Sequence, residues 1–108
     1  MNDIRVSTLS TEYIRVLVTA KLNGNFIDPT ADDVEMAFVS DGNPEPDDFT
    51  PAEWEVASAE DRSYYARILI GPGSTVGILP VGSYAIWVRV VDSPETPVKK
   101  TTNRLVVY

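Results

Sequence analysis

The longest apolar run of the chain, Gly82 to Val91, constrains the fold most strongly because it is both continuous and alternating. Successive side chains of an extended strand point to opposite faces, so the run divides into two sets. One set is uniformly apolar: Tyr84, Ile86, Val88 and Val90. The other mixes a large aromatic residue with a charge: Ala85, Trp87, Arg89 and Val91. We therefore expect a central strand whose first face lies in the core and whose second face is half solvated or lies against a partner.

The start of this strand, Gly82-Ser83-Tyr84, resembles the tyrosine corner of immunoglobulin-like sandwiches, in which a tyrosine donates a hydrogen bond to backbone upstream of it. Turn signals separate the other alternating segments at intervals of about 8 to 12 residues. These expected strands cover residues 4–7, 12–22, 31–40, 54–56, 63–70, 76–80 and 101–108. The sequence thus predicts one all-β domain, residues 1–108, folded as an immunoglobulin-like antiparallel β-sandwich of seven or eight short strands.

Three local motifs predict where the chain turns. Asn23-Gly24 tolerates the positive φ of a tight hairpin, so the chain should reverse there. The segment 31–40 has a helix-capping start, but its alternating apolar residues favour a strand. Thr50-Pro51-Ala52-Glu53 matches a capping box with proline at the first helical position. It predicts one helical turn near residues 50–54, which would set Trp54 against the core.

The residue types that most enzyme mechanisms need are missing from the sequence. It has no cysteine and no histidine, which excludes disulfides, thiolate metal sites and the commonest general base. Ser63, Ser74 and Ser83 therefore have no histidine to activate them. The glycine-rich stretch 71–77 lacks the spacing and the lysine of a phosphate loop, which favours a turn. We expect no catalytic residue, no cofactor and no enzymatic activity.

An acidic stretch places oxygen-bearing side chains at alternate positions, as the calcium loop of an EF-hand does. These residues are Asp41, Asn43, Glu45 and Asp47. However, Pro46 stands where that loop needs glycine, and Ala52 stands where it needs a bidentate glutamate. A solvated acidic loop without metal is the favoured interpretation, and a calcium site of another kind is the alternative.

The net charge of −7 is unevenly distributed. The window from Leu22 to Asp61 holds 12 of the 16 acidic residues and no lysine or arginine. An acidic middle repels phosphate, so nucleic acid is not an expected partner. No apolar run approaches the roughly 20 residues of a membrane-spanning helix, so a membrane is not expected either. The window is interpreted either as a solvated acidic surface or as an acidic pole that docks on a basic patch.

Trp87 beside Arg89 has the composition of a contact patch, because tryptophan and arginine are enriched at the centres of protein interfaces. The candidate interface residues are Trp87, Arg89, Asp47, Asp48, Lys99, Lys100 and Tyr108. A second interpretation concerns sugar binding, in which Trp54, Trp87, Tyr65 and Tyr108 would form an aromatic platform. Neither interpretation assigns a metal or a cofactor to these residues.

A series of motifs resembles small immunoglobulin-like virion structural proteins of tailed bacteriophages, particularly those of actinobacteria. The matching segments are residues 11–16, 29–32, 34–38, 65–72, 82–90 and 93–98, including Gly82-x-Tyr84-x-x-Trp87-Val88-Arg89-Val90. The resemblance implies a non-enzymatic structural subunit in the virion, assembled in the host cytoplasm as a capsid decoration, tail or neck component. Its implied partners are other virion proteins or further copies of itself. The alternative is a carbohydrate-binding or adhesion module, which would more usually carry a secretion signal; residues 1–5 show none.

Overall fold

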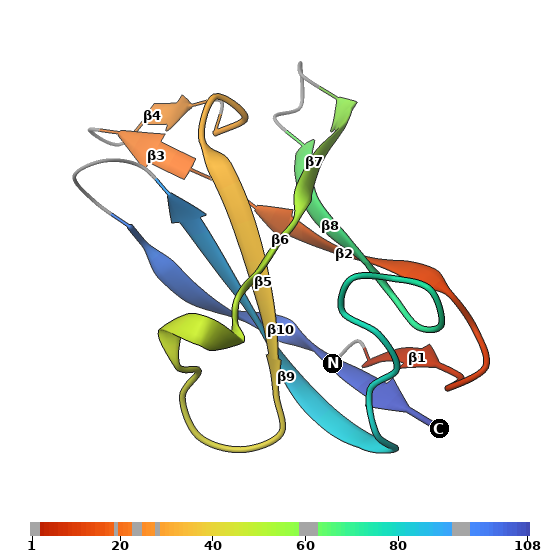
Figure 1. Ribbon diagram of the computed structural model, residues 1–108. Coiled ribbons are helices and arrows are strands. Elements are labelled where there is room, and N and C mark those ends of the chain that lie inside the picture. Colours follow the sequence, from red (N-terminus) through yellow and green to blue (C-terminus); the bar gives the residue numbers. More distant parts are fainter. Residues whose placement is uncertain (1–2, 19, 23–24, 28, 59–62, 92–95) are drawn as a thin grey trace.

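The computed structural model describes residues 3–18, 20–22, 25–27, 29–58, 63–91 and 96–108, which form two layers of β-structure (Figure 1). The larger sheet has the strand order β1 (Asp3–Val6), β10 (Val98–Val107), β9 (Gly82–Val91), β5 (Asp33–Val39) and β6 (Thr50–Pro51). The smaller sheet has the order β2 (Glu12–Val18), β8 (Ser63–Ile70) and β7 (Glu53–Ser58). A separate pair, β3 (Ala20–Leu22) and β4 (Asn25–Ile27), and a 3₁₀ turn, η1 (Pro46–Asp48), complete the described elements.

This strand order confirms the immunoglobulin-like β-sandwich. In that fold one sheet contains strands C, F and G, and the other contains strands B, E and D. Here β5, β9 and β10 form the first set, and β2, β8 and β7 form the second, with antiparallel neighbours throughout. The expectation of a wholly antiparallel structure is wrong at one edge, where β1 runs parallel to β10. Alternation alone cannot give strand direction; the observed register sets Ile4 beside Leu105 and Val6 beside Val107.

The core lies between the two sheets and is built from alternate residues of their strands. Three of the four residues predicted to face inward from β9, namely Tyr84, Ile86 and Val88, are buried, and Val90 packs against them partly buried. Their core neighbours are Val6, Ile14, Val16, Val34, Met36, Ala66, Ile68, Ile70, Leu105 and Val107. Removing apolar side chains from water contributes roughly 1.5–3 kcal/mol for each large one that is fully buried, so this cluster is the main source of stability.

The predicted tyrosine corner is present at the start of β9. The Tyr84 hydroxyl donates a hydrogen bond of 2.6 Å to the carbonyl oxygen of Pro80, four residues upstream. Trp54 also lies where the sequence predicts, packed against the core, and its indole Nε1 donates to the carbonyl oxygen of Asp32 at 2.7 Å. Both aromatic side chains thus bury their rings and still satisfy their polar atoms.

The predicted helical turn near residues 50–54 is wrong, because the helical turn forms earlier, at η1. There the Glu45 backbone N–H donates to Asp48 Oδ2 at 2.7 Å, and the Glu45 side chain accepts from the Asp48 backbone, so Glu45 and Asp48 cap each other. Thr50 and Pro51 instead pair with β5, and the chain continues from β6 into β7. The pairing with Met36 and Glu35 holds this segment extended despite its local capping signal.

Three other predicted segments differ in the structure. Residues 12–22 form two strands in different sheets, β2 and β3, rather than one. Residues 76–80 form no strand, whereas the last strand begins three residues before residue 101, at Val98. Together with the short strands β3, β4 and β6, these changes give ten described strands instead of seven or eight. Asn23 and Gly24 lie outside the described residues, between the antiparallel strands β3 and β4.

The glycine-rich stretch after β8 is the turn that the sequence predicts. Gly71 has φ +103°, and a Cβ there would lie 2.1 Å from the carbonyl oxygen of Ser10. The Thr11 hydroxyl donates to the carbonyl oxygen of Pro72 at 2.7 Å, which ties this turn to the segment before β2. The glycine is therefore needed for close backbone packing. No helix of the described residues is long and apolar enough to cross a membrane.

Candidate interface on the five-stranded sheet

The outward face of β9 places Trp87 and Arg89 side by side along one strand. The register sets Ala37 and Lys100 beside Trp87, and Glu35 and Val98 beside Arg89. Ala37 and Ala85 belong to this outer face by alternation, yet both are buried, with only 1% and 6% of their surface exposed. This part of the face is therefore covered, although the sequence predicts a face that is at least half solvated unless a partner lies on it.

The cover comes from the chain itself. The segment between β5 and β6 folds back over β9, and with the strands it borders a hollow of about 370 Å³. The hollow is lined by Asn43, Pro44, Pro46, Phe49, Trp87, Arg89 and Val98. We call these seven residues the Trp87 hollow. Two prolines and the capped turn η1 restrict the backbone of the covering segment, so its walls have few conformations to lose on binding.

Arg89 is held in place within the Trp87 hollow. Its Nε and Nη2 atoms each lie 2.6 Å from Oε1 of Glu35, and its guanidinium carbon lies 4.3 Å from the centre of the Phe49 ring. The side chains of Arg89 and Glu35 are 20% and 21% exposed. Partial burial strengthens such a pair relative to a surface ion pair. Arg89 therefore serves as a fixed, neutralised wall of the hollow rather than as a free charge.

Trp87 has an unsatisfied polar atom. Its indole Nε1 is buried and has no hydrogen-bond acceptor among the described residues. A buried donor without an acceptor costs about 1–3 kcal/mol, and most native structures avoid it. Trp54, the other tryptophan of the chain, has its acceptor in the Asp32 carbonyl. The indole N–H of Trp87 is therefore a buried donor whose missing hydrogen bond lowers the stability of the fold.

The structure brings most of the predicted interface residues together, but not all. Trp87, Arg89 and Lys100 share the outer face of the larger sheet, and exposed Asp47 and Asp48 belong to η1, next to Pro46 of the hollow. Lys99 is paired with Val88 and so faces the other side of the sheet. Tyr108 lies beyond the opposite end of β10, where the guanidinium carbon of Arg5 is 5.5 Å from its ring centre. Lys99 and Tyr108 are therefore separate from the Trp87 hollow.

The predicted aromatic platform for sugar does not form as a single surface. Trp54 packs against the core, whereas Trp87 lies on the outer face of the larger sheet. Tyr65 lies on the outer face of the smaller sheet, beside Arg15, and Tyr108 lies near β1. Among the described residues, no group of three or more acidic side chains lies where it could hold a metal ion.

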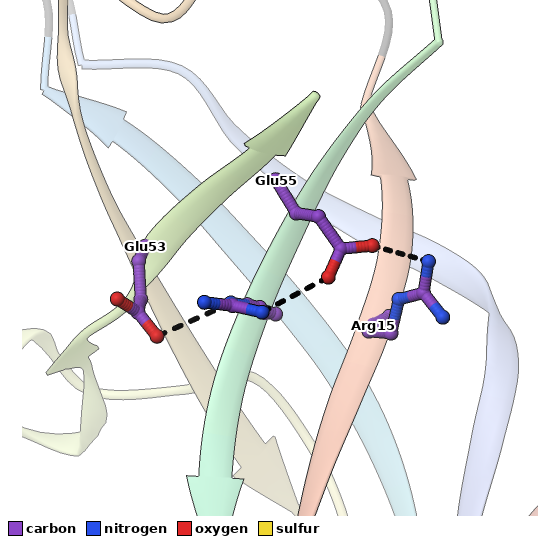
Figure 2. A network of polar contacts seen from close by, with 4 residues as sticks. Arg15, Glu53 and Glu55 are labelled. Atoms are coloured by element: carbon purple, nitrogen blue, oxygen red, sulfur yellow. Dashed lines mark hydrogen bonds and ion pairs between the residues drawn. The ribbon is translucent and has the colours of Figure 1, made fainter. Parts of the chain in front are cut away.

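The outer face of the smaller sheet carries a second cluster, which sequence reasoning missed. Glu55 pairs with Arg15 through Oε2 and with Arg67 through Oε1, the latter at 3.0 Å (Figure 2). Glu53 Oε1 lies 3.2 Å from Nε of Arg67. The guanidinium carbons of Arg15 and Arg67 lie 5.2 and 4.4 Å from the ring centres of Tyr65 and Tyr13. We call this the Tyr–Arg cluster.

Charge pairing raises the pKa of Arg67 in this cluster. Desolvation lowers the pKa of Arg67, but the nearby Glu53, Tyr13 and Glu55 raise it by more, so the net direction is upward. Its guanidinium therefore stays charged. The signal that could have revealed the cluster is a repeated pattern, Tyr-x-Arg-x-Leu, at residues 13–17 and 65–69.

The two faces present groups that are suited to binding. The hollow offers aromatic rings and a fixed guanidinium, and exposed Asp47 and Asp48 follow its Pro46 in the turn η1. Comparison with known proteins gives no relative: the chain matches no family model, no curated protein and no solved structure. Its function is therefore inferred from fold, geometry and sequence motifs.

Proposed function

We propose that this chain is a non-enzymatic structural subunit of a tailed-phage virion, a capsid decoration, tail or neck component, that acts through protein–protein contacts. The observation that carries the proposal is the Trp87 hollow, in which an aromatic anchor and a held arginine lie on the outer face of an immunoglobulin-like sandwich. Tryptophan and arginine at the centre of a patch are the residues that most often dominate binding energy. The resemblance of the sequence motifs to phage virion proteins supplies the biological setting.

The hollow suits a protein partner for two physical reasons. Arg89 is already ordered by Glu35 and Phe49, so little side-chain entropy is lost on binding. Exposed Asp47 and Asp48 at the rim would steer a basic partner surface toward the hollow.

The virion setting is tested by quantitative mass spectrometry of purified particles of the phage that encodes the chain. We expect the chain at a fixed copy number relative to the major capsid protein. If the chain disappears from the particles as they are purified further, until their protein composition no longer changes, a structural role is contradicted. Binding of glycans by the isolated chain, without any incorporation into particles, would favour the carbohydrate-binding alternative.

The role of the hollow is tested by adding purified chain to particles that lack it and measuring the bound fraction. Trp87→Ala should weaken binding by about thirtyfold, the scale of a 2 kcal/mol anchor. Tyr65→Ala is the matched control, because Tyr65 is an aromatic residue on the outer face of the other sheet. Asp47→Asn with Asp48→Asn should mainly reduce the salt dependence of association. Equal binding by Trp87→Ala and wild type would remove Trp87 as the anchor.

A further inference from the structure

The smaller sheet ends in an edge strand, β2, whose outer edge is unpaired in the described part of the chain. In the described part of the chain β2 pairs only with β8, through seven consecutive residues without a bulge. The other sheet ends are shorter or irregular: β1 has four residues, β6 has two and includes Pro51, and β7 has a register shift between Val56 and Ser58. Proteins protect edge strands with charged side chains, lysine above all, and with proline, bulges or short length. Residues 12–18 contain no proline, lysine or bulge, and the charge of Arg15 on their outer face is paired with Glu55.

The open edge also exposes apolar side chains. Tyr13 and Leu17 of β2 are 45% and 56% exposed, on the outer face of the smaller sheet. A long, regular edge strand with exposed apolar residues favours pairing with another strand, which satisfies its free backbone groups and covers these side chains. The edge therefore has the properties of a strand-pairing surface.

The chain itself contains a strand that matches this edge. The pattern Tyr-x-Arg-x-Leu occurs in β2 (13–17) and again in β8 (65–69), and the two copies pair antiparallel with Arg15 opposite Arg67. Each tyrosine is then opposite a leucine, and each arginine lies over the tyrosine of the other strand. The β2–β8 ladder thus shows that this pattern is complementary to itself in antiparallel orientation.

We propose that the occupant of the β2 edge is β2 of a second copy of this chain, paired antiparallel with Arg15 opposite Arg15. Tyr13 of one copy then lies opposite Leu17 of the other, and Ile14 opposite Val16, as the pattern pairs within the molecule. The two smaller sheets join into one six-stranded sheet. This inference goes beyond the virion role and does not depend on it.

The charges near the edge permit this pairing. Each Arg15 keeps its own Glu55 partner, and the face as a whole carries two arginines and two glutamates that pair with one another. Arg15 and Arg67 already lie opposite each other in the β2–β8 ladder with this compensation. The acidic turn η1 belongs to the other layer, away from β2 (Figure 1). The acidic residues of η1 in the two copies therefore do not come close to each other when the β2 strands pair.

The proposal is tested by sedimentation velocity over a concentration series. Wild type should form a dimer, and Leu17→Lys should weaken dimerisation about tenfold or more by placing a charge on the edge. Leu69→Lys is the matched control, because it adds the same charge to the same face but in the central strand β8. Circular dichroism melts should show both variants folded. A chain that stays monomeric at every concentration, or a dimer that both variants weaken equally, would overturn edge pairing.

The register is tested by oxidative cross-linking, which is clean because the chain has no cysteine of its own. Arg15→Cys should form an intermolecular disulfide by itself. Tyr13→Cys and Leu17→Cys should cross-link efficiently only when the two variants are mixed, since each faces the other across the joint. Cross-linking of Tyr13→Cys or Leu17→Cys alone, at the level of the mixture, would overturn this register. A monomer that instead binds a peptide from a different protein along β2 would overturn the second copy as the occupant.

Discussion

The two outer faces of the sandwich use the same residue types for different purposes. On the larger sheet, Arg89 lies over Phe49, pairs with Glu35 and is covered by a segment of its own chain. On the smaller sheet, Arg15 lies over Tyr65 and pairs with Glu55, and no described segment covers them in the same way. The Arg89 and Arg15 side chains are 20% and 50% exposed. The contact chemistry is alike, so the degree of burial decides how much each contact contributes to stability.

The difference also bears on function. The covered face has little conformational freedom left, so it can bind a partner at the hollow without large rearrangement. The uncovered face is locally neutral and ends in an open edge, so its natural partner is another strand. The following predictions test this contrast, in order of decreasing effect.

The largest effect is expected for aromatic truncation. Trp87→Ala should lower the free energy of unfolding by about 2 kcal/mol, less than a fully buried tryptophan because Trp87 is only partly buried. Tyr65→Ala on the other face should lower the free energy of unfolding by clearly less. Urea denaturation of both variants measures the difference, and the Trp87→Ala domain should remain folded without denaturant. Equal losses would show that the two faces are energetically alike.

A smaller effect is expected for the arginines. Arg89→Met should lower the free energy of unfolding by about 1.5 kcal/mol, because it leaves the partly buried carboxylate of Glu35 without its hydrogen bonds. Arg67→Met should cost less, since its partners Glu53 and Glu55 keep access to water. Adding Glu35→Gln to Arg89→Met should recover part of the loss. If it recovers nothing, the Glu35–Arg89 contact is not what stabilises the covered face.

Tyr84 provides a reference for the two outer faces, because it lies in the core between the two sheets. Tyr84→Phe should cost about 1 kcal/mol, the scale of one net hydrogen bond, by removing the bond to Pro80. Urea melts again give the measurement. Unchanged stability would show that the tyrosine corner contributes nothing here.

The smallest effect is expected from salt. Double-mutant cycles at low and at high sodium chloride should show that the coupling of Arg15 with Glu55 falls as salt rises. The coupling of Arg89 with Glu35 should keep most of its value, since partly buried pairs are screened less. Equal salt sensitivity would mean that the cover over Arg89 does not exclude solvent ions.

The alternation of apolar and polar residues by itself determines much of this fold. The bounds of the strands at 63–70 and 82–91 agree with the sequence pattern, and so do the buried residues Tyr84, Ile86 and Val88. The reason is that the side-chain period of a strand is a local property, which apolar residues at every second position reveal directly. A local motif likewise predicts the tyrosine corner, whereas Trp54 packs against the core without the helical turn from which that packing was predicted.

Other features depend on contacts between residues far apart in the chain. The direction of β1, the extended form of Thr50 and Pro51, and the position of η1 follow from pairing partners that local propensity does not specify. The sequence places Trp87 and Arg89 on one face, but only the folded chain brings Glu35 and Phe49 to Arg89 and a covering segment onto Trp87. The alternation of apolar and polar residues predicts which face of the sheet a residue occupies. The strand register and the path of the loops determine which residues it contacts there, because both are set by long-range packing.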